Sequence, residues 1–383
     1  MATVLVTDAL QRKALVAVRS LGRAGHRVLV GEHMWPNTAF FSRHADGVAL
    51  YPSPARDPAA FRRWLEDYLV RHGVDVLLPM DDATTEACLG GGLPCATALP
   101  TPEAFHLFRD KARTMEHARR RGVPVPPGAS LAADPVAALK QARELGFPVV
   151  VKPRVGSGGR GLALARTPEE FTRVLAARDP GEPATLLQSW VGEGPQLDVC
   201  LLYDQGGRRV AAFVQREVRH YPLTGGPSTV QESVKAPELI ALAERLVDGL
   251  GWVGPLEAEF RYDEAGEPRL MEVNPRFWAS LFLAVLAGVD FPRLTVDVAL
   301  GSRPSAPTDY PGGLRCRWLL PGDVLHYLTN PHRAQMDPPF WGARRRGVRD
   351  DMVAADDPLP MVGFFLAAAV YLTRPELRRQ VLR

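Results

Sequence analysis

The sequence predicts two kinds of architecture in one chain: an α/β part with a parallel sheet near the N-terminus, and an α+β part after it. Short apolar runs alternate with helical patterns over the first hundred residues, which favours a parallel sheet covered by helices. Longer strands joined by glycine-containing turns follow from about residue 186, which favours hairpins. Pro100-Thr101-Pro102 separates the two parts.

The N-terminal part has the rhythm of a Rossmann-like sheet. Strands are predicted at 4–6, 28–31 and 74–79, with a helix between the first two that ends near Gly25. The last of these strands stops at Asp81-Asp82. The turn after the first strand lacks a glycine fingerprint, which disfavours a dinucleotide site. We therefore expect residues 1–102 to form a Rossmann-like domain.

Residues 103–185 are predicted to form a small subdomain with a glycine-rich loop. One helix is expected over 103–121 and a second over 135–145, followed by strands at 149–153 and 162–165. Between these strands, residues 156–161 contain four glycines. Glycine lets backbone N–H groups close on phosphate oxygens without obstruction by a Cβ atom. With Lys152 at the end of the preceding strand, the loop predicts a phosphate-binding site; an ordinary turn with a solvated lysine is the alternative.

Residues 186–302 are predicted to form the core, and residues 303–383 a C-terminal tail of unknown role. Strands are expected at 186–188, 197–203, 210–218, 257–262 and 270–273, with a helix over 237–250. In the tail, the apolar run 361–372 follows Arg344-Arg345-Arg346. A buried helix after a solvated basic loop is the favoured interpretation, and contact with an anionic membrane surface is the alternative.

Composition excludes several classes of protein. The net charge of +3 over 383 residues argues against a surface built for nucleic acid. The four cysteines have neither zinc-site nor thioredoxin-like spacing, and such scattered cysteines are typical of reduced, cytoplasmic proteins. The N-terminus lacks a secretion signal pattern, and the longest apolar run has twelve residues, too short for a bilayer. Only five of the 46 basic residues are lysines.

Alternation along two strands predicts a metal site. Glu257, Glu259 and Arg261 share one strand face, opposite Leu256, Ala258 and Phe260, as residues two apart do in any strand. Glu272 and Asn274 share a face in the next strand, and the turn at 264–266 would bring them beside Glu259. Carboxylate and amide oxygens suit Mg²⁺, with Mn²⁺ as the alternative. Glu257 is a spare carboxylate, and a solvated polar sheet face is the competing interpretation.

The order of these features resembles the ATP-grasp superfamily over about residues 1–300. The segments that carry the resemblance are Val150-Val151-Lys152-Pro153 with its glycine loop, and Met271-Glu272-Val273-Asn274-Pro275-Arg276. Among its members, carboxylate–amine ligases such as the carbamoyl-phosphate synthase large subunit and D-alanine–D-alanine ligase are the expected relatives. The resemblance implies a pre-ATP-grasp domain followed by a two-part ATP-grasp fold, with ATP held between two sheets.

The resemblance also implies roles for individual residues. Lys152 and Arg276 would be catalytic, with Arg276 on the γ-phosphate or an acyl-phosphate. The nucleotide-binding set comprises phosphate contacts at Lys111, Lys152, Gly158, Gly159 and Gly161, adenine contacts along Gln188, Ser189, Trp190 and Val191, and a ribose contact at Glu193 or Gln196. The sequence departs from the family at the ribose position, where Asp198 is a further candidate. The remaining lysines, Lys13, Lys140 and Lys235, are expected at the surface.

A basic strand end that runs into a Gly-Gly-Pro-Ser-Thr segment predicts a lid over the substrate. Its candidate contacts to a carboxylate or phosphate are Arg216, Arg219, Gly225, Gly226 and Ser228. Similar segments occur in ATP-grasp ligases, and a mobile surface hairpin is the alternative.

The implied reaction is ATP-dependent ligation of a small-molecule carboxylate to an amine, with release of ADP and phosphate. An enzyme that uses bicarbonate, of the carboxylase or carbamoyl-phosphate type, is one alternative. A non-catalytic nucleotide-binding or membrane-surface protein is the other. The expected partners are an acid and an amine, with no nucleic acid; a homodimer is left open.

Overall fold

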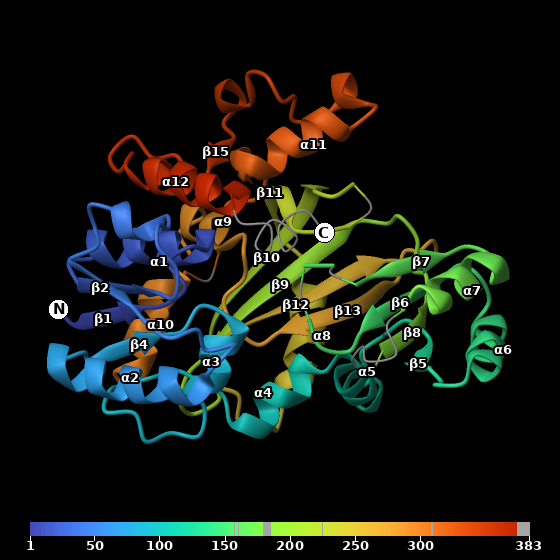
Figure 1. Ribbon diagram of the computed structural model, residues 1–383, viewed down its shortest axis with the longest axis horizontal. Helices are drawn as coiled ribbons and strands as arrows, with labels where there is room; N and C mark the ends of the chain where they lie inside the picture. Colours follow the sequence, from blue (N-terminus) through green and yellow to red (C-terminus); the bar gives the residue numbers. More distant parts are fainter. Residues whose placement is uncertain (157, 160, 179–184, 224, 308, 374–383) are drawn as a thin grey trace.

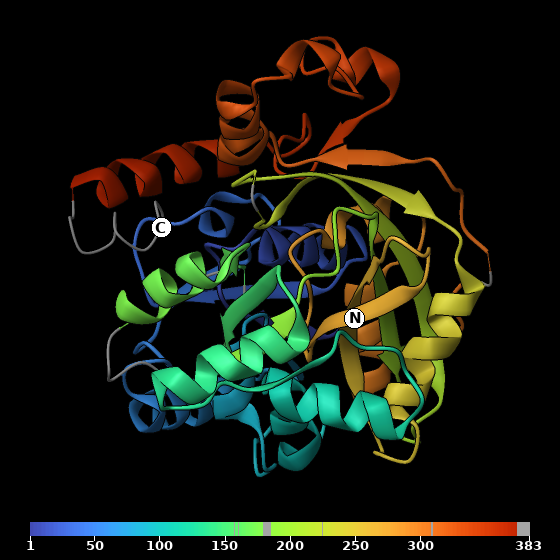
Figure 2. The ribbon, with the colours of Figure 1, turned by 90° about the vertical axis from the view of Figure 1, so that its right-hand side faces the viewer.

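The computed structural model describes residues 1–156, 158–159, 161–178, 185–223, 225–307 and 309–373. These residues build three sheets. The sheet that is last in the chain lies between the other two in Figure 1, and the C-terminal segment runs along one side in both views (Figures 1 and 2). The α/β and α+β fold class predicted from the sequence is confirmed. The predicted segment boundaries at residues 102, 185 and 302 stay predictions.

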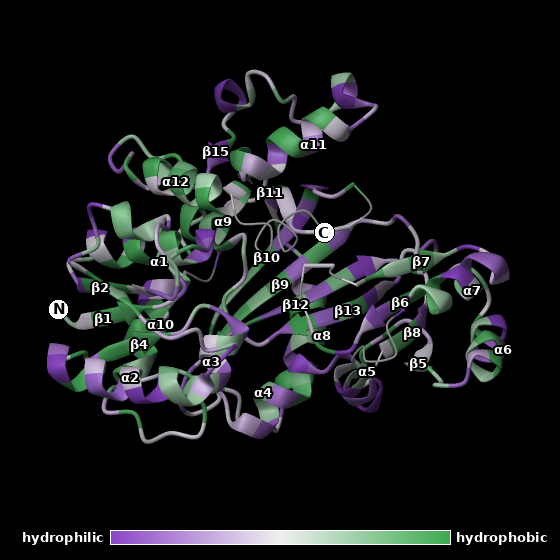
Figure 3. Ribbon diagram, in the orientation of Figure 1, coloured by the Kyte–Doolittle hydropathy of each residue, from purple (hydrophilic) through white to green (hydrophobic). Residues whose placement is uncertain are grey.

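The N-terminal sheet is fully parallel, with strand order β3-β2-β1-β4. Strands β1, β2 and β4 are mostly apolar and buried, as expected for strands covered on both faces, whereas Val48 and Leu50 of the edge strand β3 are exposed (Figure 3). Its elements are β1 (Thr3–Val6), α1 (Arg12–Arg23), β2 (Arg27–Glu32), the short turn of helix η1 (Ala39–Phe41), β3 (Gly47–Leu50), α2 (Pro58–His72), β4 (Val76–Leu78) and α3 (Asp82–Cys88). The Rossmann-like parallel sheet is therefore present as predicted.

Asp8 ties the end of β1 to the end of β4. It has a φ of 60°, and no other non-glycine residue in the described chain has a positive φ. Its carboxylate accepts hydrogen bonds from the amides of Met80 (3.1 Å) and Asp81 (3.0 Å) and from the Thr84 hydroxyl (2.7 Å). Burial raises the pKa of Asp8 to about 6, and the neighbouring charges of Asp81 and Glu32 add to this shift.

We expect Asp8→Asn to stabilise the protein above pH 6. The pKa of Asp8 in the folded protein exceeds the ordinary value of 3.8. Ionisation of Asp8 therefore lowers the free energy of unfolding as the pH rises from 3.8 through about 6. Asparagine tolerates the left-handed backbone and keeps an acceptor oxygen, but it carries no buried charge. Thermal unfolding between pH 5 and 8 checks this: the advantage of the variant should grow with pH, and parallel curves would contradict it.

The second sheet has four antiparallel strands in the order β5-β8-β6-β7. The predicted single helix over 103–121 is wrong, because Asp110 ends one helix and caps the next by accepting hydrogen bonds from the amides of Ala112 and Arg113. The elements are α4 (Pro102–Arg109), α5 (Lys111–Arg120), β5 (Gly128–Ser130), α6 (Pro135–Leu145), β6 (Val149–Pro153), β7 (Ala163–Ala165), α7 (Pro168–Ala176) and β8 (Thr185–Ser189). Lys111 thereby becomes the first residue of α5.

The third sheet has seven strands in the order β13-β12-β9-β10-β11-β14-β15. The segment after Pro227, expected to be part of a loop, instead begins strand β11 at Ser228 and pairs with β10. The elements up to residue 299 are β9 (Gln196–Tyr203), β10 (Arg209–His220), β11 (Ser228–Val234), α8 (Pro237–Val247), β12 (Gly254–Tyr262), β13 (Pro268–Asn274), α9 (Leu281–Leu286) and α10 (Phe291–Ala299). This sheet and the second one flank the predicted nucleotide site.

The C-terminal segment is docked on the rest of the chain rather than hanging free. Arg12 and Arg19 of α1 form ion pairs with Asp351 and Asp357, and both carboxylates are buried. Its elements are β14 (Arg315–Arg317), η2 (Leu319–Asp323), α11 (Val324–Thr329), η3 (Arg333–Gln335), η4 (Ala343–Arg346), β15 (Arg349–Asp350) and α12 (Pro360–Thr373). The apolar run forms a helix, α12, as predicted, but the favoured interpretation of a buried helix is wrong, because Val362, Phe365, Leu366 and Leu372 are exposed. No described helix is both long enough and apolar enough to cross a membrane.

Candidate active site

The two acidic strands pair as the alternation predicted. Glu259 of β12 lies opposite Glu272 of β13, and Glu257 lies opposite Asn274. The Asn274 amide donates hydrogen bonds to Glu259 (2.9 Å) and Glu257 (3.0 Å). The opposite strand face is buried core, with Leu256, Ala258 and Phe260 all fully covered. Among the described residues, no three His, Cys, Asp or Glu side chains form a ready-made metal cluster, so a cation here would rely on the carboxylate pair with the amide oxygen.

Two lysines from the second sheet reach across to this pair. The Lys111 ammonium lies 3.0 Å from Glu272 and donates a hydrogen bond to the carbonyl of Gly156 (2.6 Å). Lys152 donates to the carbonyl of Met271 (3.2 Å) and is only 6% exposed. The Lys111 amide also bonds the carbonyl of Arg154 (2.8 Å), which fixes the start of α5 beside the end of β6. Lys111 is therefore paired with Glu272, and Lys152 is held at the carbonyl of the residue before Glu272.

Burial shapes the charges of this cluster. It lowers the pKa of Lys152 to about 8, and the charge of nearby Lys111 adds to the effect. Burial alone would raise the pKa of Glu272, but the two ammoniums outweigh it and hold that pKa below its ordinary value. Burial raises the pKa of Glu259 and Glu257 well above the ordinary value, and neighbouring carboxylates contribute further. The negative charge of the carboxylate pair is thus favoured on Glu272 rather than on Glu259.

The two predicted glycine loops approach each other. Gly158, Gly159 and Gly161 have φ values near 70°, where a side chain is strained. A Cβ on Gly159 would lie 3.5 Å from the carbonyl oxygen of Gly225, so the phosphate loop and the lid segment face each other. At Gly226 a Cβ would collide with the carbonyl oxygen of Tyr221, 2.4 Å away. Residues 157, 160 and 224 of these loops lie outside the described part.

The predicted adenine-binding segment follows β8 out of the second sheet. The amides of Ser189 and Trp190 donate to the carbonyls of Pro127 (2.9 Å) and Pro148 (3.0 Å). Those two donors are therefore occupied, and Gln188 and Ser189 are paired with neighbouring strands, which leaves the backbone after Ser189, with the Val191 amide, for a base. Gln188 is 2% exposed, and its Nε2 atom has no partner among the described residues.

The ribose candidates separate in space. Glu193 is exposed in its turn. Gln196 instead joins the carboxylate pair: its amide donates to Glu259 (3.2 Å) and accepts from Arg261 (2.7 Å). Arg261 also lies over the ring of Trp190, with its guanidinium carbon 5.7 Å from the ring centroid. The ribose assignment of either residue stays a prediction.

The lid arginines have protein partners. Arg216 is ion-paired with Glu232 of β11, with its side chain 44% exposed. Arg219 is 5% exposed; its guanidinium lies 3.0 Å from Asp323 of the C-terminal segment and also donates to the carbonyl of Pro338. The Ser228 hydroxyl donates to the carbonyl of Arg219 on β10 and to that of Val230 on its own strand. Arg216 is thus the more accessible candidate for a substrate anion, and Arg219 anchors the C-terminal segment.

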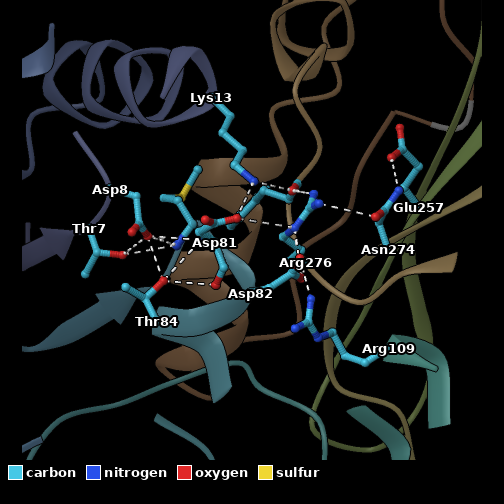
Figure 4. Close-up of polar contacts among 12 residues, drawn as sticks. Thr7, Asp8, Lys13, Asp81, Asp82, Thr84, Arg109, Glu257, Asn274 and Arg276 are labelled. Carbon is cyan, nitrogen blue, oxygen red and sulfur yellow. Dashed lines mark hydrogen bonds and ion pairs between the residues drawn. The ribbon is translucent and has the colours of Figure 1, made fainter. Parts of the chain in front are cut away.

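Arg276 lies where the N-terminal sheet meets β13 (Figure 4). Its guanidinium donates to Asp82 (3.0 Å), to the carbonyl of Phe277 (2.8 Å) and to the Asn274 amide oxygen (3.2 Å). Asp82 is also paired with Arg109 at 2.7 Å. The carboxyl edge of the first sheet therefore positions the arginine that follows the metal-site strand.

The prediction that Lys13 lies at the surface is wrong. Its side chain is 4% exposed, whereas those of Lys140 and Lys235 are 79% and 54% exposed, as predicted. The Lys13 ammonium donates to the carbonyl of Phe277 (3.0 Å) and lies 4.0 Å from Asp81. Burial lowers the pKa of Lys13 to about 8, and the charge of Arg276 contributes. A lysine of α1 thus holds the loop that carries Arg276.

We expect Lys13→Met to lower turnover about tenfold while nucleotide affinity changes less than twofold. The Phe277 carbonyl keeps its hydrogen bond from Arg276, but the loop loses its link to α1, and small misplacements of a catalytic group are costly. Calorimetric titration with an ATP analogue and initial rates measure the two quantities. Lys235→Met is the surface control, and unchanged turnover in Lys13→Met would contradict the role.

Comparison with known proteins agrees with this geometry. Residues 108–220 match the RimK-like ATP-grasp domain, and residues 193–320 match the family described as ATP-grasp in the biosynthetic pathway with Ter operon. The chain carries an ATP-grasp domain. Biotin carboxylase 2 of Populus trichocarpa is 28% identical over 218 residues, which cover 53% of this chain and 41% of that protein. The carbamoyl phosphate synthase large chain of Deinococcus radiodurans is 32% identical over 190 residues, which cover 46% of this chain and 18% of that protein.

The fold extends beyond the matched segments. The structure of a biotin carboxylase–nucleotide complex from Campylobacter jejuni superposes with a TM-score of 0.68 at 19% identity. The superposition covers 82% of this chain and 74% of the biotin carboxylase chain. This similarity confirms the expected ATP-grasp fold. The sequence match to the carbamoyl phosphate synthase large chain confirms the expected resemblance to that protein. The chain spans about two fifths of the length of the plant biotin carboxylase.

Several residues of this ATP-grasp site escaped the sequence prediction. Gln215 and Glu217 of β10 lie on the same face as Asp198 of β9, which pairs with Glu259. Their alternation with Arg216 was the available signal. For Lys13, the available signal was the scarcity of lysine in the chain, which applies to Lys13 as it does to Lys111 and Lys152.

Proposed function

We propose that the protein is an ATP-dependent ligase that joins a small-molecule carboxylate to an amine. The observation that carries the proposal is the meeting of Lys111 and Lys152 with the Glu259–Glu272 pair, next to Arg276 on the same strand end. Phosphoryl transfer requires cationic side chains that bind the phosphates, carboxylates that bind a metal, and a positioned arginine. The ATP-grasp relatives support the same class of reaction.

Mg²⁺ suits the residues present. Glu259 and Glu272 offer hard oxygen ligands on one face of the sheet. The Asn274 side chain turns its NH₂ group to Glu259 and its oxygen to Arg276, so that oxygen would join the ligands once the amide turns over. When bound there, the metal would neutralise charge on the nucleotide phosphates. The glycine cradle at 158, 159 and 161 would take the phosphates, since only glycine fits its backbone without strain. The base would use the backbone after Ser189, with the Val191 amide.

The chain's residues act by positioning and charge. Lys111 and Lys152 hold the phosphates, and Arg276 faces the charge that develops on the transferred group. A carboxylate oxygen of the acid attacks the γ-phosphorus of ATP, and ADP leaves. The amine then attacks the acyl carbon of the acyl-phosphate, and phosphate leaves with the former carboxylate oxygen. The four free cysteines fit a reaction in the cytoplasm with no thiol nucleophile.

The test is ADP release from pools of acids and amines, with mass spectrometry of the products. The proposal expects release that requires an acid and an amine together and yields their condensation product. ADP release stimulated by bicarbonate without an added acid would contradict it and favour a carboxylase-type enzyme.

A further inference from the structure

A row of polar side chains continues from the carboxylate pair across three more strands. Glu259 lies opposite Asp198 of β9, and Asp198 lies opposite Gln215 of β10. Glu217 shares the face of Gln215, two residues further along, and lies opposite Gln231 of β11. Directly opposed residues in antiparallel strands lie about 5 Å apart at Cβ. The row therefore begins at the proposed metal site and leads towards the lid.

Hydrogen-bonding groups in this row are buried and unused. Asp198, Gln215 and Gln231 are 2% exposed or less, yet Asp198 Oδ1, Gln215 Oε1 and Gln231 Nε2 have no partner in the described part of the chain. Glu217 is only partly buried, and no described residue forms a hydrogen bond or ion pair with its carboxylate. Buried polar groups are nearly always satisfied, so several unsatisfied ones on one face indicate a missing ligand.

The free atoms are held in defined orientations. Gln215 Nε2 donates to Asp198 Oδ2 (3.0 Å) and to the Ser280 hydroxyl, which leaves its carbonyl oxygen as the free atom. The Cys316 thiol donates to Gln231 Oε1 at 3.1 Å, which leaves the NH₂ group free. Across β9 and β10 the unused groups are therefore acceptors, and β11 offers a donor.

Two buried free acceptors, on Asp198 and Gln215, share a sheet face with the partly buried carboxylate of Glu217. Acceptors of this kind match the donors of an ammonium group. We propose that Asp198, Gln215 and Glu217 form the subsite for the attacking amine, with Gln231 donating to an acceptor on the same substrate. The subsite lies one strand from Glu259, beside the place where the acyl-phosphate would form. This inference rests on the proposed ligase function and names the substrate group that the site selects.

The test uses the full-length protein with Glu217→Gln and Asp198→Asn, which remove charge and keep shape. With the acid and amine found by ADP release, each variant should raise the KM for the amine about 10- to 100-fold, as expected for the loss of a buried hydrogen bond to a charged group. The Kd for an ATP analogue with Mg²⁺ should change less than twofold, which also shows that the variants fold. Glu244→Gln, an exposed carboxylate paired with Arg209, is the matched control.

A second readout does not depend on turnover. With the ATP analogue and Mg²⁺ present, methylammonium, 1,4-diaminobutane and L-lysine are compared with bicarbonate and acetate as shifts in Tm. At least one amine should raise the Tm of the wild type and of Glu244→Gln but not of Glu217→Gln. A shift by bicarbonate alone, an unchanged amine KM, or a loss of nucleotide affinity in place of amine affinity would overturn the subsite. Absence of acid-dependent ADP release in the wild type would instead overturn the ligase proposal.

Discussion

Lys152→Met should lower kcat/KM for ATP about 100-fold or more. Its ammonium is buried beside the Met271 carbonyl and faces Lys111 and Glu272, so a bound phosphate would contact it with little competition from water. Methionine keeps the length and loses the charge. Initial rates and calorimetric titration with an ATP analogue measure the effect on turnover and affinity.

Two further lysine variants make the result interpretable. Lys140→Met removes an ammonium whose side chain is 79% exposed and should change neither rate nor affinity. Lys152→Arg keeps the charge but replaces a compact ammonium with a planar guanidinium, so it should recover only a small part of the activity. Wild-type affinity in Lys152→Met would remove this residue from the nucleotide site.

Glu272→Gln should abolish the gain in nucleotide affinity that Mg²⁺ provides. Glu272 carries the negative charge of the carboxylate pair, since the two lysines hold its pKa below the ordinary value. Glutamine leaves one neutral oxygen for a metal and frees Lys111 from its ion pair. Titration of an ATP analogue with Mg²⁺ and with a chelator gives the difference, which we expect to fall by about tenfold or more.

The control for this variant lies on the same hairpin. Glu267→Gln changes an exposed carboxylate in the turn between β12 and β13 and should keep the full effect of Mg²⁺. A Glu272→Gln protein that still binds the nucleotide more tightly with Mg²⁺ would contradict the metal assignment.

The part of the site that alternation governs could be predicted from the sequence. A period of two fixes the face that each of Glu259 and Glu272 occupies in its own strand near the site. Their register also depends on a bulge: the turn pairs Phe260 with Leu270, and the shift beside Phe260 places Glu259 opposite Glu272 rather than Met271. The break of the predicted helix at Asp110 was also readable, because aspartate is a favoured N-cap residue. Local rules of this kind act over a few residues, and the sequence states them directly.

Contacts between distant segments were out of reach. Lys13 is buried and donates a hydrogen bond to the carbonyl of Phe277, 264 positions later. No residue pattern within α1 predicts this burial. Arg219 is neutralised by Asp323, 104 residues away, so a basic strand end that suggested a substrate site anchors the C-terminal segment. Such burial depends on how sheets and segments pack together, which periodicity does not encode.

The most direct test of the ligase mechanism follows an oxygen atom. With the acid identified by ADP release and labelled with ¹⁸O in its carboxylate, a single turnover in the presence of the amine should transfer one label to the released phosphate, because phosphate leaves with the carboxylate oxygen. Mass spectrometry of the phosphate measures this. One ¹⁸O atom per phosphate is the result that the proposed acyl-phosphate route predicts, and unlabelled phosphate formed together with the condensation product would contradict it.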